Sequence, residues 1–275
     1  MQSARLPSSS TCCADENPAT IFSLDEVRVR YGDTTALERV TLRIEPGEAV
    51  AFVGPSGAGK TTLLRLLNGS VRPALGTVKV SGRALASMGP DEFRRVRASI
   101  GVVHQDLRLI PNLRVLQNVI AGRLGTMSLG TSVRALLFPP KYLVHEVHEV
   151  LERVGIAEKL YERTDRLSGG QRQRVAIARA LFQRPVALFA DEPVSSVDPA
   201  RARAVLQLLT SVSRERGMTL CVSLHNLELA REFFFRLVGL RHGRVVFDSP
   251  TSDLGNADFD ALYRLDPLEV LENGG

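Results

Sequence analysis

The stretch at residues 54–61 constrains this chain more than any other part of the sequence. It matches the pattern G-x-x-x-x-G-K-[ST] and reads Gly54, Pro55, Ser56, Gly57, Ala58, Gly59, Lys60 and Thr61. An apolar run at 49–53 precedes it and a helix-like run at 62–68 follows, which is the strand–turn–helix setting of a phosphate loop. The glycines let backbone N–H groups surround an anion, and the new helix adds its positive end. We therefore predict that Lys60 reaches the β and γ phosphates of a nucleotide and that the Thr61 hydroxyl ligates Mg²⁺.

Composition favours a globular protein with mixed surface charge. The chain has 275 residues, of which 44% are hydrophobic, enough for one large domain or two small ones. Its net charge of +5 comes from 35 basic and 30 acidic residues, and the basic clusters carry no interleaved aromatic residues, so no nucleic acid partner is expected. Three cysteines do not make a disulfide framework. No apolar run approaches the ~20 residues of a membrane helix, so any membrane role is expected to go through a partner.

Strand-like and helix-like runs alternate along most of the chain, which predicts an α/β fold with a mostly parallel sheet. The polar, serine-rich residues 1–20 are expected to form a flexible tail. Between about 107 and 180, helix periodicity replaces the strand signals, and we predict a helical subdomain inserted into the α/β core, with a loop at 124–140. Helices are further expected at 226–235 and 252–265, and a strand at 244–247.

Two acids follow a buried strand. The apolar run 186–190 ends in Asp191 and Glu192, and acids at this end of a parallel strand lie where the phosphates of a bound nucleotide lie. Asp191 is predicted to hold Mg²⁺. Glu192 points in a different direction and is predicted to orient or deprotonate the attacking water.

A second glycine-containing helix start lies at residues 167–171. Ser168 and Gln171 have the spacing of a capping box, which explains two of its residues as local structure. It does not explain Gly169 and Gly170, because glycine in a helix is up to about 1 kcal/mol less favourable than alanine. We infer that something approaches this backbone closely. A free helix N-terminus is an anion site, and two phosphate-binding ends in one chain suggest a nucleotide held between two subunits.

Together these motifs resemble the nucleotide-binding subunit of an ABC transporter over about residues 21–250. The phosphate loop matches the family's Walker A motif, residues 188–192 its Walker B motif, and residues 167–171 its signature LSGGQ. Ser-Val at 196–197 departs from the commoner Ala-Leu of the D-loop but leaves its aspartate in place. Four more residues match family positions. Tyr31 matches the aromatic residue that stacks on adenine in the family, Gln105 the Q-loop glutamine, Asp198 the D-loop aspartate and His225 the switch histidine.

The resemblance implies a P-loop NTPase (RecA-like) core with an antiparallel β portion, in a nucleotide-binding domain at 21–275. It implies an ATPase that uses ATP and Mg²⁺ in a head-to-tail dimer, with each Walker A motif facing the partner's signature. Glu192, His225, Gln105 and Lys60 would be catalytic, and Thr61, Gln105 and Asp191 would bind the metal. The nucleotide would be bound by Tyr31, residues 54–61, Thr62, Ser168, Gly169, Gly170, Gln171 and Asp198.

Three longer stretches, at 121–125, 223–232 and 238–248, resemble the ATPases of phosphonate importers. The expected partners are therefore a second copy, integral membrane permease subunits and, indirectly, a solute-binding protein, at the cytoplasmic face of the inner membrane. Related importers carry phosphite or other oxyanions. An exporter or lipoprotein-release ATPase is an alternative, and a soluble ABC ATPase acting on DNA or ribosomes is a more distant one, because two cassettes, coiled-coil arms and zinc modules are not visible in the sequence.

Overall fold

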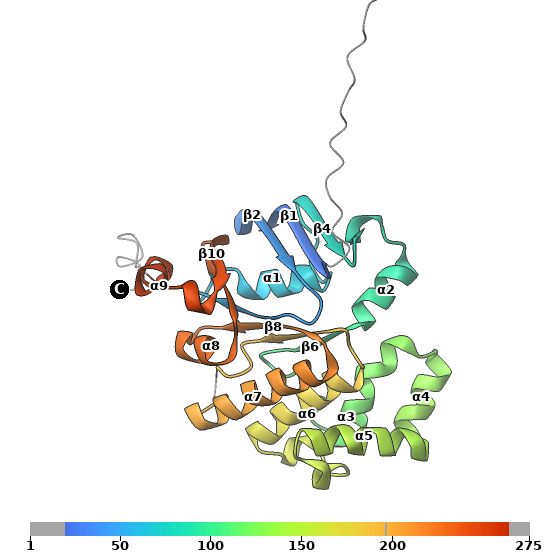
Figure 1. The fold of residues 1–275 in the computed structure, drawn as a ribbon. Helices are drawn as coiled ribbons and strands as arrows, with labels where there is room; N and C mark the ends of the chain where they lie inside the picture. Colours follow the sequence, from blue (N-terminus) through green and yellow to red (C-terminus); the bar gives the residue numbers. More distant parts are fainter. Residues whose placement is uncertain (1–19, 196, 264–275) are drawn as a thin grey trace, which may run out of the picture.

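The computed structural model describes residues 20–195 and 197–263 and contains two β-sheets with helices packed around them (Figure 1). Nearly all of the predicted tail at 1–20 lies outside the described residues. The larger sheet has the order β10-β9-β3-β8-β7-β6, in which only β10 is antiparallel to its neighbour. Its strands are β3 Ala49–Val53, β6 Ile100–Val103, β7 Ala187–Asp191, β8 Thr219–Leu224, β9 Arg236–Arg241 and β10 Arg244–Pro250.

The smaller sheet is antiparallel throughout, with the order β2-β1-β4-β5. Its strands are β1 Phe22–Tyr31, β2 Thr34–Ile44, β4 Leu75–Val80 and β5 Arg83–Ala84. The mostly parallel sheet and the antiparallel portion expected from the sequence are therefore both confirmed.

The helices divide between the two faces of the larger sheet. The α-helices are α1 Lys60–Leu67, α2 Pro90–Ala98, α3 Val115–Ile120, α4 Leu129–Leu137, α5 Lys141–Arg153, α6 Gly169–Phe182, α7 Pro199–Arg216, α8 Leu227–Phe233 and α9 Asn256–Tyr263. Short 3-10 helices lie at Leu85–Ser87, Ala121–Thr126, Ala157–Lys159, Thr164–Arg166 and Thr251–Asp253. Figure 1 shows α1 on the side of the antiparallel sheet and α3, α5, α6 and α7 on the other side.

Alternation along the central strand explains this division. Val50 and Phe52 of β3 belong to a core shared with α1 and the antiparallel sheet. Ala51 and Val53 belong to a second core, shared with α3, α5, α6 and α7. Because successive side chains of a strand point to opposite faces, a strand buried on both faces must be apolar throughout, as this one is. The helices of the predicted insertion thus share one core with a face of the sheet.

Two local predictions are wrong. Residues 129–137 form helix α4 instead of lying in a loop, because Gly130 falls in the first helical turn and Ser128 caps it by accepting a hydrogen bond from the Thr131 N–H (3.4 Å). The helix expected to run to residue 235 ends at Phe233, and after a two-residue link strand β9 begins at Arg236.

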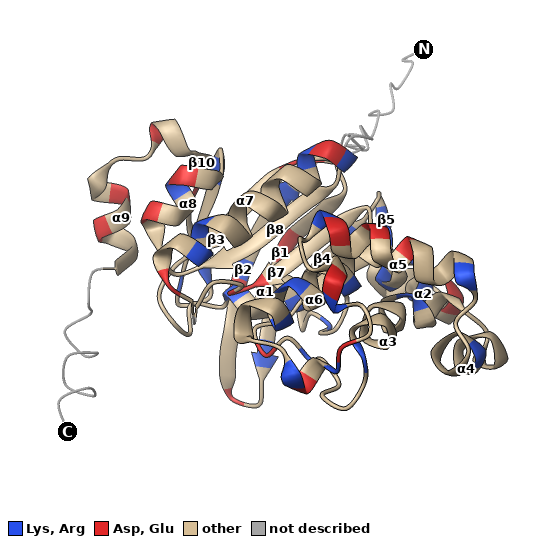
Figure 2. Ribbon diagram, turned by 90° about the horizontal axis from the view of Figure 1, so that it is seen from below, with Lys and Arg blue, Asp and Glu red and all other residues tan. Residues whose placement is uncertain are grey.

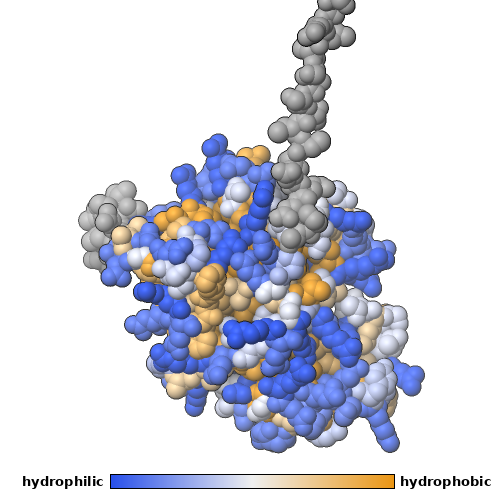
Figure 3. Space-filling model, in the orientation of Figure 1, coloured by the Kyte–Doolittle hydropathy of each residue, from blue (hydrophilic) through white to orange (hydrophobic). Residues whose placement is uncertain are grey.

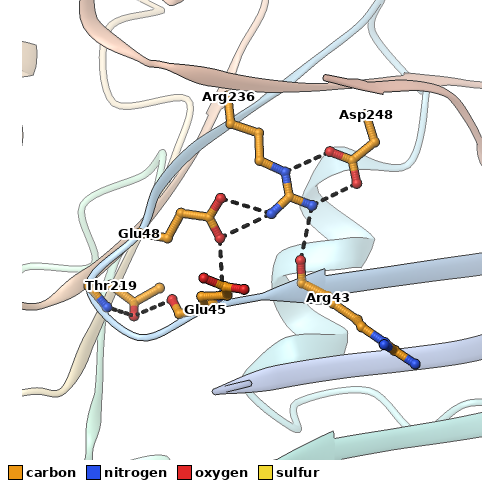
Figure 4. Close-up of polar contacts among 7 residues, drawn as sticks. Arg43, Glu45, Glu48, Thr219, Arg236 and Asp248 are labelled. Atoms are coloured by element: carbon orange, nitrogen blue, oxygen red, sulfur yellow. Dashed lines mark hydrogen bonds and ion pairs between the residues drawn. The ribbon is translucent and has the colours of Figure 1, made fainter. Parts of the chain in front are cut away.

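Arg236, at the start of β9, joins the two sheets (Figure 4). Its guanidinium donates to both oxygens of Asp248 on β10 (2.6 and 2.7 Å) and both oxygens of Glu48 (2.8 and 3.0 Å). A fifth bond reaches the Arg43 carbonyl on β2 (3.0 Å). Hydrogen bonding to Asp248 first, and then to Glu48, raises the pKa of Arg236. The half-buried arginine is therefore held charged and fixes the antiparallel sheet against the edge of the parallel one.

Charge and hydropathy are mixed over the surface. Basic and acidic residues are interspersed along the helices and loops in Figure 2, without a single-sign field. Hydrophilic atoms cover most of the face in Figure 3, and the apolar atoms on it form small separate patches. Among the described residues, no helix combines the length and apolarity that a membrane crossing requires.

Candidate nucleotide site

The phosphate loop connects β3 to α1, and its glycines are required by close packing. Gly54 has φ = 150°, and a Cβ at this position would lie 2.1 Å from the Leu240 carbonyl oxygen of β9. Gly59 has φ = 104°, and its Cβ would lie 2.7 Å from the Ala36 carbonyl oxygen of β2. A side chain at either position would collide with backbone. The loop thus lies between a strand and a helix, as the sequence predicts, and its glycines pack against both sheets.

Lys60 begins α1 and is 4% exposed. Its Nζ donates to the carbonyls of Gly54 (2.8 Å) and Pro55 (2.9 Å) and lies 3.7 Å from Glu192 Oε1. Burial lowers the pKa of Lys60, and the charges of Glu192 and Asp191 oppose that shift. The ammonium group is thus held at the loop by carbonyl oxygens and lies beside one of the two predicted acids.

A small hydrogen-bond network holds the strand-end acids. Asp191 Oδ1 accepts from Thr61 Oγ1 (3.0 Å) and from Ser223 Oγ (2.7 Å). The Ser223 hydroxyl in turn accepts from the N–H of Glu192 (2.8 Å). Glu192 has φ = 45°, a left-handed conformation, and its Oε1 lies 3.7 Å from Lys60 Nζ. The two adjacent acids therefore face different partners.

Thr61 and Asp191 fit the requirements of Mg²⁺. This ion prefers oxygen ligands and, beside phosphates, takes only one or two from the protein while water and phosphate supply the rest. The hydroxyl and the carboxylate lie within hydrogen-bond distance of each other at the mouth of the loop. No group of three or more His, Cys, Asp or Glu residues able to hold a metal occurs among the described residues, and a site of this kind does not need one.

Four predicted positions reach the same edge of the sheet. Strands β3, β8, β7 and β6 are adjacent and parallel, and they are followed directly or within two residues by Gly54, His225, Glu192 and Gln105, respectively. Ligands of open parallel sheets bind at this edge. His225 and Gln105 are exposed, which leaves both side chains accessible from solvent. Tyr31 lies on the other sheet, at the turn between β1 and β2, and is 45% exposed.

The second helix start has the predicted capping box. Ser168 Oγ accepts from the Gln171 N–H (3.3 Å), and Gln171 Oε1 accepts from the Ser168 N–H (3.0 Å). A Cβ at Gly169 or Gly170 would meet no atom within 4 Å, and neither residue has a positive φ. Nothing inside the described chain therefore requires glycine at these positions. The helix they begin, α6, packs on the face of the sheet opposite α1.

Asp198 has a local role. Its carboxylate caps α7, accepting from the Arg201 N–H at 3.0 Å.

The sequence did not single out Ser223 or Gln173 as site residues. Gln173 is a buried residue of α6 whose amide donates to the Pro193 carbonyl, one residue after Glu192, so it connects the signature helix to the acid loop. The signal for Ser223 is a hydroxyl in an otherwise mostly apolar, fully buried strand.

Known protein families match this chain closely. A family model described as ABC transporter matches residues 37–195, more than half of the chain. A phosphonates import ATP-binding protein PhnC of Anaeromyxobacter dehalogenans is 48% identical over 90% of this chain, which spans about half the length of that protein (49%). A PhnC 2 protein of Pseudomonas aeruginosa is 44% identical over 90% of this chain and 93% of its own length.

Solved structures agree with these matches. The cbiO1 protein of Clostridium perfringens, part of the ABC transporter complex cbiONQ, superposes with a TM-score of 0.73 at 26% identity, covering 93% of this chain and 94% of its own. A bacterial ABC transporter cassette solved as a dimer gives 0.71 at 31% identity, covering 84% of this chain and 98% of its own. The fold, the motif order and these likenesses together show that the chain belongs to the ABC transporter family, as one of its ATP-binding proteins.

Proposed function

We propose that this chain is the ATPase of an importer for phosphonates or related phosphorus oxyanions, and that it drives transport through partner membrane subunits. The main support for ATPase activity is the network that joins Lys60, Thr61, Asp191 and Glu192 at one edge of the sheet. The names of the Anaeromyxobacter and Pseudomonas relatives support the transported class. The site described above recognises nucleotide phosphates, so selectivity for the cargo would lie in the partner subunits.

In this proposal each described side chain has one task. Lys60 exchanges its bonds to the loop carbonyls for phosphate oxygens of ATP, where its charge offsets that of the transferred group. Thr61 and Asp191 hold Mg²⁺, which when bound neutralises charge on the phosphates. Glu192 orients and deprotonates the attacking water. His225, after β8, contacts the γ-phosphate, and Gln105, after β6, senses the water and metal. Tyr31 stacks on the adenine.

The second half of each site comes from another copy of the chain. The phosphate loop and the signature helix pack on opposite faces of the sheet. Among the described residues, no atom lies close enough to the signature glycines to require glycine there. A related cassette, solved twice as a dimer, supports a paired arrangement. In the dimer the Ser168 hydroxyl and the N–H groups of Gly169 and Gly170 would bind the γ-phosphate held by the partner subunit.

As an importer subunit without a described membrane-spanning helix, the chain would associate with a membrane through its permease partners. We place it at the cytoplasmic face of the inner membrane, where ATP is available, with a solute-binding protein delivering cargo on the far side. The helices between β6 and β7 offer the surface for the permease.

Replacing Gly170 with alanine tests the shared site. Because the added methyl group meets nothing within 4 Å, we expect the isolated fold to keep its stability or gain up to about 1 kcal/mol from helix propensity. ATP hydrolysis should fall about tenfold or more, a loss of about 1.4 kcal/mol in transition-state stabilisation, because the methyl group would separate the backbone from the partner's phosphate. Thermal unfolding and phosphate release measure the two effects.

Gly130→Ala is the matched control, since Gly130 is also the second residue of a helix with open space around its Cβ. It should give a similar change in stability and leave hydrolysis by the isolated chain unchanged. Equal activity of the Gly170→Ala variant and the wild type would contradict the shared site.

Transport itself is tested with the native complex. The tagged chain is purified from its own host in mild detergent with its bound membrane subunits. The complex is reconstituted into liposomes and assayed together with the solute-binding protein of the same host. We expect ATP-dependent uptake of labelled methylphosphonate, reduced by phosphite, and no uptake with the Glu192→Gln variant. Export of the label, or recovery of nucleic acid or ribosomes in place of a membrane protein, would refute the proposed function.

A further inference from the structure

The last described helix, α9, is packed against the strands and helix that flank the nucleotide site (Figure 1). Leu262 is fully buried, and the ring of Phe259 meets the ring of Phe247 on β10 edge to face, with centroids 5.9 Å apart. The Arg231 guanidinium of α8 lies 5.3 Å from the Phe259 centroid. Nη1 of Arg241, at the end of β9, donates to the Ala261 carbonyl (2.8 Å). These contacts fix the position of α9 on the core.

The final residue of α9 reaches the site. The hydroxyl of Tyr263 donates to the backbone carbonyl of His225 at 3.1 Å. Burial raises the pKa of Tyr263. His225 is the predicted switch residue.

In the part of the chain that the structure describes, the other contacts that fix the backbone around His225 lie at the two residues on either side of it. Leu224 is the last residue of β8 and pairs in register with Val53 of β3. Asn226 caps α8 by accepting from the Leu229 N–H at 3.0 Å. His225 is the one residue between the strand and this cap. A bond to its carbonyl therefore restricts the rotation that decides where its exposed side chain points.

We propose that Tyr263 is a positioning residue for the switch histidine, and that α9 thereby couples to the chemistry of the nucleotide site without contacting the nucleotide. The phenol holds the His225 carbonyl in a fixed position relative to α9. The packing of α9 against the core determines the position of the Tyr263 hydroxyl. The inference rests on the proposed function, in which the His225 side chain contacts the γ-phosphate.

Tyr263→Phe tests the inference, because it removes the hydroxyl and keeps the buried ring. Loss of one hydrogen bond predicts a threefold to tenfold fall in kcat for ATP hydrolysis, with a KM for ATP that changes less than about twofold. Hydrogen exchange at the amides of residues 225–229 should be faster, and thermal stability should stay close to that of the wild type. Tyr142→Phe is the control, because Tyr142 is an exposed tyrosine on α5, and we expect it to change none of these quantities.

A double-mutant cycle separates positioning from general structural support. In a His225→Ala background, Tyr263→Phe should have no further effect on kcat, because a residue that acts through His225 has nothing left to position. Equal losses in both backgrounds, or a Tyr263→Phe variant with unchanged kcat and exchange, would overturn the inference. Wild-type protein that binds but does not hydrolyse ATP would instead refute the proposed function, and the exchange measurement would still decide whether Tyr263 orders the loop.

Discussion

Replacing Glu192 with glutamine is expected to lower the rate of ATP hydrolysis by about 10²–10⁴-fold while ATP binding persists. Glutamine has the size of glutamate but cannot accept a proton from water. The bond from the backbone N–H of residue 192 to Ser223 does not involve the side chain, so the loop should keep its shape. With binding intact and hydrolysis blocked, two copies should remain closed around ATP. Phosphate release and size-exclusion chromatography with ATP and Mg²⁺ measure both effects.

Glu215→Gln is the matched control for this prediction. Glu215 is exposed near the end of α7, and its nearest charged partner is Arg153 at 3.8 Å, so the change should leave both hydrolysis and oligomeric state unaltered. Turnover by the Glu192→Gln variant at the rate of the wild type would remove Glu192 from the role of general base.

Replacing Lys60 with methionine is expected to weaken ATP binding about 10-fold to 150-fold, since a hydrogen bond to a charged group contributes about 1.5–3 kcal/mol. Methionine fills much of the space of the lysine stem in this buried position but supplies neither charge nor donor. The change also removes the bonds to the carbonyls of Gly54 and Pro55, so the loop itself should become less ordered. Equilibrium binding of a fluorescent ATP analogue, displaced by ATP, measures the affinity.

Lys141→Met provides the comparison for this measurement, because Lys141 is exposed at the start of α5. It should bind ATP as the wild type does. If the Lys60→Met variant retained wild-type affinity, the assignment of the 54–61 loop to the phosphates would fail, and with it the proposed nucleotide site.

Much of the site could be predicted because it depends on local pattern and parallel strand order. The glycines of the phosphate loop indicate a backbone conformation in which a side chain would collide with its surroundings. Gly54 and Gly59 are packed against backbone carbonyls in this way. Asp191 and His225 follow apolar strands, and parallel strands place their ends together. The roles assigned to these residues stay predictions, which the variants above examine.

Other features depend on partners that are distant in the sequence. Strand β9 was missed because its pairing with β3 across the sheet, and not its local pattern, makes it a strand. Helix α4 was missed because Gly130 reads as a loop signal, although glycine in a first turn is tolerated. The bond from Tyr263 to the His225 carbonyl joins residues 38 positions apart and has no signature in either segment.

The left-handed backbone at Glu192 has a consequence for the evolution of this protein. A residue with a Cβ in that conformation is strained by about 1–2 kcal/mol, and glycine would relieve the strain. The chain therefore gives up stability to hold a carboxylate in a backbone conformation that favours glycine. Laboratory selection for thermal stability alone should therefore favour Glu192→Gly and yield a protein that is more stable but does not hydrolyse ATP.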